Sequence, residues 1–205
     1  FSISSYTGTG SAATVGHGLG AIPKMILMKK LSGSAGWVVY NNTIGAGKYL
    51  RLNTTDAEAS DTNIFNNTAP TSSVFSVGTD ADNNGSGATY IAYCFTEKTG
   101  FSKFGSYLGN GNADGAFVYT GFKPAFVLGK NATVAGQHWF MNDNKRGLNG
   151  GSNWLKADAT DAELTNLVNC DLLSNGFKLR NNNDIFNDAG ETFIYMAFAE
   201  APLVG

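Results

Sequence analysis

The chain has 205 residues, enough to bury a core as one large or two small domains. Charged residues make up only 15% and there are 26 glycines, a profile that suits short strands and tight turns better than helices. A net charge of −2 excludes the basic surface typical of nucleic-acid binding, and no apolar run approaches the roughly 20 residues that a membrane-spanning helix needs.

The first half of the chain is expected to form short strands. Aromatic and β-branched residues gather in segments that Gly, Asn, Ser, Thr and Asp separate. These segments cover residues 1–6, 24–30, 37–41, 49–53, 74–77 and 89–95. Short helices are indicated only at 55–58 and 160–163, where T-x-x-E has the spacing of a capping box.

The second half of the chain repeats the first. Paired segments keep their order at offsets between 101 and 105 residues: 5–10 with 106–111, 20–29 with 121–130, 36–40 with 138–142, 55–60 with 160–165, and 89–97 with 192–200. We therefore predict an all-β protein of two tandem repeats, 1–101 and 102–205. Each repeat would be a small β-sandwich or jelly-roll-like module; the alternative is one larger pseudo-symmetric sandwich.

His17 lies in a glycine-rich loop that resembles part of an active site. When Gly20 is aligned with Gly121, and the prolines that follow them are aligned too, His17 falls opposite Val118. The two copies share the loop but not the histidine. His17 is therefore interpreted as a loop residue rather than a catalytic one.

Two motifs suggest cofactors or metals but lack the required context. Residues 8–13 match G-x-G-x-x-A, yet a strand pattern follows where a dinucleotide fingerprint needs a helix. Asp80, Asp82 and Asn84 have the spacing of a calcium loop, but its twelfth position is Ile91 and not glutamate. Turn glycines and a hairpin turn are the favoured interpretations, with a non-EF-hand calcium site on the 80–84 segment as the alternative. No cofactor is predicted.

No catalytic site is predicted from the sequence. The paired carboxylates of the capping boxes have a structural explanation, and Glu97 and Glu200 end equivalent strands. Cys94 and Cys170 do not align in the repeat and are expected to be free, buried thiols.

The candidate ligand-binding residues are aromatic and polar side chains of the second repeat. His138 and Trp154, with Asn181, Asn182 and Asn183, offer stacking and hydrogen bonds to a glycan. The alternative is that the tryptophans that align in the repeat, Trp37 and Trp139, belong to the core.

A resemblance to a known module covers essentially the whole chain. It rests on residues 5–30, 66–78, 84–130 and the stretches 172–183 and 192–200, where the strings between strands match as well as the apolar pattern. These segments resemble an uncharacterised duplicated β module of tailed bacteriophages, frequent in marine phages, in tail-fibre-like and other virion proteins. The resemblance provides no catalytic or ligand residues.

The resemblance implies a non-enzymatic virion surface protein, made in the cytoplasm of a bacterial host. A tail-fibre or receptor-binding module that contacts a host surface glycan or protein is the leading hypothesis. The alternatives are a capsid decoration, head-fibre or collar protein, and a capsule-degrading enzyme. The expected partners are other virion proteins. Few charges protect the strand edges and the tail at 201–205 is apolar, so a homotrimer is expected.

Overall fold

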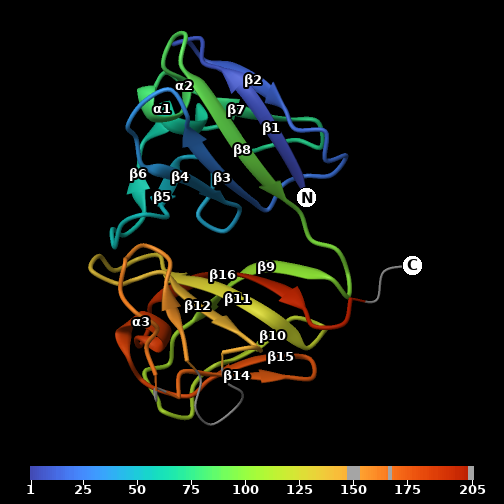
Figure 1. Cartoon of the computed structure of the whole chain (residues 1–205), viewed down its shortest axis with the longest axis vertical. Helices are drawn as coiled ribbons and strands as arrows, with labels where there is room; N and C mark the ends of the chain where they lie inside the picture. The colour runs from blue at the N-terminus through green and yellow to red at the C-terminus, as the bar shows by residue number, and fades with distance from the viewer. Residues whose placement is uncertain (147–152, 166–167, 203–205) are drawn as a thin grey trace. The chain divides into compact units, whose positions relative to one another are not determined.

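A computed structural model describes residues 1–146, 153–165 and 168–202. It is all-β, as the composition predicts, and every pairing between its named strands is antiparallel. The chain forms two compact units (Figure 1): unit 1 comprises Phe1–Asn53 and Glu58–Thr96, and unit 2 comprises Thr54–Ala57 and Glu97–Gly205. The boundary thus follows Thr96, five residues before the predicted one, and unit 2 includes a short segment from the first half.

Unit 1 is a β-sandwich of a larger and a smaller sheet. Its strands are β1 (Ser2–Thr7), β2 (Ala13–Gly16), β3 (Met25–Lys30), β4 (Trp37–Asn41), β5 (Lys48–Arg51), β6 (Ala59–Ser60), β7 (Val74–Val77) and β8 (Thr89–Phe95). Its helices are α1 (Thr62–Phe65) and α2 (Ala81–Asn84). The larger sheet has the order β1-β8-β3-β4-β5-β6, and β2 pairs with β7. One apolar core joins Ile26 and Val38 of the larger sheet to Phe75 of the smaller.

Unit 2 has a comparable arrangement. Its strands are β9 (Ser102–Leu108), β10 (Phe117–Tyr119), β11 (Pro124–Asn131), β12 (Phe140–Asp143), β13 (Leu155–Lys156), β14 (Cys170–Leu173), β15 (Gly176–Leu179) and β16 (Thr192–Ala199), and its helix is α3 (Asp184–Asn187). One sheet has the order β13-β12-β11-β16-β9 and the other β10-β15-β14. A separate core packs Val127 and Phe193 against Phe177.

The two units share one topology. The order β1-β8-β3-β4-β5 in unit 1 corresponds strand by strand to β9-β16-β11-β12-β13 in unit 2, and the pair β2-β7 corresponds to β10-β15. Among the described residues, each unit has a core cluster of its own.

The predicted helices at the two capping boxes do not form. Residues 55–58 and 160–163 have no helical turn in the structure. Glu58 instead forms an ion pair with Lys48, and Asp161 forms one with Lys156. The four-residue helices lie elsewhere, each after an Asp or Asn whose side chain accepts a hydrogen bond from a backbone N–H at the helix start. No helix in the described part of the chain is long and apolar enough to span a membrane.

Candidate functional site

Trp154 is not on the surface. The side chain is 2% exposed and its ring packs edge-on against Phe186, with 4.9 Å between ring centroids. It belongs to the core cluster of unit 2, and Trp139, outside that cluster, is 1% exposed. Trp37 is only half-buried. The prediction of Trp154 as a stacking surface for a ligand is therefore corrected: the strand bridge at 154 turns the ring inward.

His138 is held by a carboxylate. Its Nδ1 lies 2.7 Å from Oδ2 of Asp158, whose side chain is almost fully buried, and Oδ1 of Asp158 accepts a hydrogen bond from Trp139 N at 2.8 Å. The ring is about one-quarter exposed. Asp158 thus connects the imidazole to the start of β12, and a structural role accounts for these contacts.

The Asn181–Asn183 segment shapes the entry to α3. Asn183 caps the helix by accepting from Ile185 N at 2.9 Å, and Asn181 Oδ1 accepts from Asn183 N at 3.0 Å. Asn182 is exposed. Two of the three candidate amides are therefore committed to local hydrogen bonds that build the turn.

The equivalent segment in unit 1 contains the calcium candidates. Asp80 caps α2 by accepting from Asp82 N at 2.7 Å, and Asp82 forms an ion pair with Arg51 at 2.6 Å. The Asn84 amide is buried and donates to Gly78 O and Ser11 O. Each of these side chains has a protein partner, and no group of three or more His, Cys, Asp or Glu in the described residues is placed to hold a metal ion.

His17 is a buried structural residue. Its Nδ1 accepts a hydrogen bond from Leu19 N at 3.1 Å and its Nε2 lies 3.2 Å from Thr71 O. In unit 2 the Thr120 hydroxyl is placed to accept from Phe122 N, also two residues on, at 3.5 Å. His17 therefore closes the same turn that Thr120 closes.

This equivalence corrects the predicted register between the copies. Val15 pairs with Phe75 in unit 1, and Val118 pairs with Phe177 in unit 2, so the two valines correspond. His17 then lies opposite Thr120 and not Val118. The two extra residues of the first copy fall between Leu19 and the following proline, in a turn that absorbs them without changing the strands.

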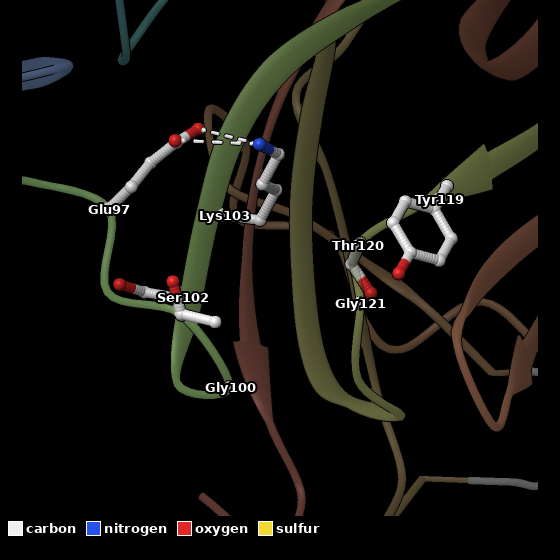
Figure 2. A pocket seen from close by; sticks show the side chains of 8 residues that line it. Glu97, Gly100, Ser102, Lys103, Tyr119, Thr120 and Gly121 are labelled. Atoms are coloured by element: carbon white, nitrogen blue, oxygen red, sulfur yellow. Dashed lines mark hydrogen bonds and ion pairs between the residues drawn. The ribbon is translucent and has the colours of Figure 1, made fainter. Parts of the chain in front are cut away.

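A pocket of about 470 Å³ lies in unit 2, within the roughly 300–1,000 Å³ typical of small-molecule sites. Two segments line it: 97–103, which leads into β9, and 119–121, at the end of β10. We call it the Tyr119 pocket. Figure 2 shows the Glu97 and Lys103 side chains directed toward each other, with Tyr119 and Thr120 on the other segment.

The charged groups of the Tyr119 pocket form one ion pair. Lys103 Nζ lies 3.3 Å from Glu97 Oε1 and 3.4 Å from Oε2, and both side chains are about one-third exposed. These distances exceed the about 2.7–2.9 Å of a tight charge-assisted hydrogen bond. Lysine has three donors and a carboxylate about four acceptor sites, so both groups keep capacity for further hydrogen bonds.

The charge of Glu97 also affects the pKa of Tyr195. Burial raises the pKa of Tyr195 to about 12, and the negative charge of Glu97 contributes to the same shift. The negative charge of Glu97 therefore affects a tyrosine in the core of unit 2 as well as the pocket. The positive charge of Lys103 balances it, so the pocket is close to neutral.

Tyr119 presents the largest apolar surface at the pocket. It is 65% exposed, and among the described residues its ring and hydroxyl have no stacking or hydrogen-bond partner. The ring lies beside Gly121, which adopts a φ of +83°; a Cβ there would come 3.6 Å from the tyrosine hydroxyl. The site therefore combines an open aromatic face with paired donors and acceptors.

Sequence reasoning missed the Tyr119 pocket. Glu97 is predicted only as the end of a strand, and no motif in the sequence indicates a role for Lys103. In the structure Phe117 and Tyr119 flank the buried Val118, which places both aromatic rings on the outer face, but three apolar residues in a row do not show in the sequence which face is buried.

Comparisons with known proteins identify a family. No curated protein and no solved structure matches the chain. One family model matches residues 1–202, a range that includes both units. The chain therefore belongs to the family described as Domain of unknown function (DUF7483).

Proposed function

We propose that this protein is a non-enzymatic binding module on the surface of a tailed-bacteriophage virion and that it contacts carbohydrate on the host cell through the Tyr119 pocket. The observation that carries the proposal is an exposed aromatic ring beside a compensated Glu97–Lys103 pair. Apolar sugar faces bury against aromatic rings, and sugar hydroxyls match sites that offer both donors and acceptors. The resemblance to phage virion modules supports the location.

The composition of the pocket favours binding over hydrolysis. Glycoside hydrolases commonly use two carboxyl groups about 5–9.5 Å apart across the scissile bond. Among the described residues that line the Tyr119 pocket, Glu97 is the one carboxylate, and it is paired with a lysine. A capsule-degrading activity therefore has less support here than recognition of a saccharide.

A matched pair of variants tests the proposal. Lys123 forms an ion pair with Glu200 at 2.8 Å, and its exposure is similar to that of Lys103, but it does not line the Tyr119 pocket. We expect Tyr119→Ala and Lys103→Ala to weaken binding to an array of neutral and acidic saccharides by about tenfold or more, and Lys123→Ala to leave it within about twofold.

Several outcomes would contradict the proposed function. Wild-type protein that binds no saccharide, or equal losses for Lys103→Ala and Lys123→Ala, would reject the pocket as a carbohydrate site. Binding to host cells that survives periodate oxidation of their surface sugars would indicate a protein receptor instead. Release of oligosaccharide from capsule would identify an enzyme.

Contacts with other virion proteins are proposed to use the strand edges. β1 and β9 are edge strands of the larger sheets, and they expose Ile3 (56%) and Leu108 (62%). Exposed apolar residues on an edge strand favour pairing with another chain. Labelling the protein in an electron-microscopy map of the particle distinguishes a tail fibre from a capsid decoration, head fibre or collar.

A further inference from the structure

The outer face of the β10-β15-β14 sheet continues from the Tyr119 pocket. Phe117 and Tyr119 lie two residues apart on β10, about 6.6 Å along the strand, and both point away from the core. Phe117 is 46% exposed and, like Tyr119, has no stacking partner among the described residues. We call these two side chains and the strand surface between them the aromatic platform.

The partner strand leaves room for the Phe117 ring. Tyr119 is opposite Gly176 in the sheet register, and a Cβ built on that glycine would lie 3.1 Å from Phe117 Cζ and 2.1 Å from Val118 O. Glycine at 176 therefore lets the phenylalanine ring extend along the sheet rather than being displaced by a neighbouring side chain. Both rings remain available to a ligand.

The charges around Phe117 are compensated. Lys178, its partner in the register, forms an ion pair with Asp114 at 2.9 Å, and Arg180 forms one with Asp171 at 3.1 Å. Single-stranded nucleic acid also stacks on aromatic rings, but it requires a positively charged groove. Paired charges beside open rings complement a neutral ligand with many hydroxyl groups.

The fold itself does not require these aromatic residues. In the register that the strand pairs establish, Phe117 and Tyr119 correspond to Thr14 and Gly16 of unit 1, which are also exposed. Unit 1 forms the equivalent strand pair with these small residues. The aromatic side chains of unit 2 thus add exposed apolar surface that the shared topology does not need, which indicates a role in binding.

We infer that the aromatic platform is a second subsite, and that the ligand of unit 2 is a neutral oligosaccharide that runs from the Tyr119 pocket over Tyr119 to Phe117. One sugar unit occupies the pocket and a following unit stacks on Phe117. This inference rests on the proposed function, because it extends the same site and specifies the length and charge of its ligand.

The test compares ligands of increasing length. Binding of the full chain is measured with neutral glucans, mannans and galactans fractionated from one to six sugar units. We expect affinity to rise with length over the first units, and Phe117→Thr, which introduces the residue of unit 1, to lower the affinity for the longer saccharides about five- to tenfold. Its effect on the monosaccharide should stay within about twofold.

The controls separate this inference from the proposed function. Thr14→Ala alters the equivalent position of unit 1 and should change no affinity. The second subsite is rejected if Phe117→Thr weakens the binding of short and long saccharides equally, or weakens neither. If Tyr119→Ala abolishes binding in that case, the pocket remains supported as a binding site. If wild-type protein binds none of the three neutral series, the second subsite is rejected; if it also binds no acidic saccharide, the proposed function is rejected as well. Tighter binding of acidic than of neutral saccharides of equal length would also overturn the neutral ligand.

Discussion

At the scale of single residues, buried polar groups explain much of the sequence that looked functional. His17 is 2% exposed and satisfied by backbone groups on both sides of its ring. Asn84 of the calcium candidates is 1% exposed and fully engaged. Burying a polar group costs free energy unless its hydrogen bonds are made. The fold therefore restricts the residue type at such positions as strictly as an active site would.

Lys130 is the clearest titratable case. Its side chain is fully buried, and Nζ donates to the backbone oxygens of Asn131 at 2.9 Å and Thr55 at 3.4 Å. Burial lowers the pKa of Lys130 from 10.5 to about 8, although the charges of Asp158 and Asp56 oppose the shift. The lysine thereby holds the segment of the first half that belongs to unit 2.

This shift predicts a pH dependence of stability. Because the pKa of Lys130 is lower in the folded than in the unfolded state, the unfolded chain binds more protons between pH 8 and 10.5, so stability rises with pH across that window. Below pH 8 the lysine is charged in both states, and its burial lowers the free energy of unfolding by the full amount, about 3 kcal/mol. We expect the free energy of unfolding of wild type to gain about 2 kcal/mol relative to Lys130→Met between pH 7 and 10.

The measurement is urea unfolding of both proteins at several pH values. Tyrosines and cysteines that titrate in the same range, such as Cys94, whose pKa burial raises to about 11, contribute equally to both and cancel. A difference between the two proteins that does not change with pH would show that Lys130 keeps its ordinary pKa in the folded state.

At the scale of elements, hydrogen bonds join a glycine-containing loop to a short helix in each unit. Asn187, at the end of α3, is fully buried and donates to Asn110, Asn112 and Asn181. Its Oδ1 accepts from the backbone N–H of Asn110, and Gly111 N donates to its carbonyl. Asn84 makes the corresponding bonds with residues 9–11 of unit 1. The repeated Gly-x-Gly loops therefore enclose a buried asparagine and do not cradle a phosphate.

This arrangement predicts a large effect of one amide. Asn187→Ala removes several hydrogen bonds to buried partners, each worth about 1 kcal/mol and more where a partner is left unsatisfied. We expect the free energy of unfolding to fall by about 3 kcal/mol. The neighbouring exposed Asn182→Ala serves as control and should change it by less than about 0.5 kcal/mol. Similar losses for both variants in a denaturant titration would contradict the proposed role of the network.

At the scale of the whole molecule, two sandwiches with separate cores make up one family domain. Antiparallel sheets with open edges are prone to pair with other chains. The edge strands β1 and β9 here carry exposed Ile3 and Leu108 where charged residues would discourage pairing. Residues 203–205 of the predicted apolar tail lie outside the described part of the chain.

We therefore predict a symmetric oligomer, with a trimer as the expected form. Light scattering at micromolar concentration should give three times the 21.6 kDa of the single chain. Ile3→Lys and Leu108→Lys should reduce the mass, because a charge on an edge strand opposes pairing, whereas Asn182→Lys, an exposed position outside the strands, should not. A wild-type mass of 21.6 kDa would show that this chain does not associate by itself.

The sequence by itself determined the class of fold and most of the strands. Of the strands predicted in the first half, those at 37–41, 74–77 and 89–95 have the observed bounds. Runs of apolar, aromatic and β-branched residues are local signals, and they persist in the folded state because 89–95 buries one face, and 37–41 and 74–77 nearly all of their side chains, in a core. β2 was missed because its segment is short and rich in small residues.

Only the tertiary structure decided the short helices, the register and the site. A capping box at 55–58 indicates a helix locally, but these residues form no helical turn in the structure, and Glu58 pairs with Lys48. Trp154 appears surface-exposed in a polar stretch of sequence but is buried against Phe186. The Tyr119 pocket joins two segments about 20 residues apart whose strands, β9 and β10, belong to different sheets, and the packing of the two sheets on one core brings them together.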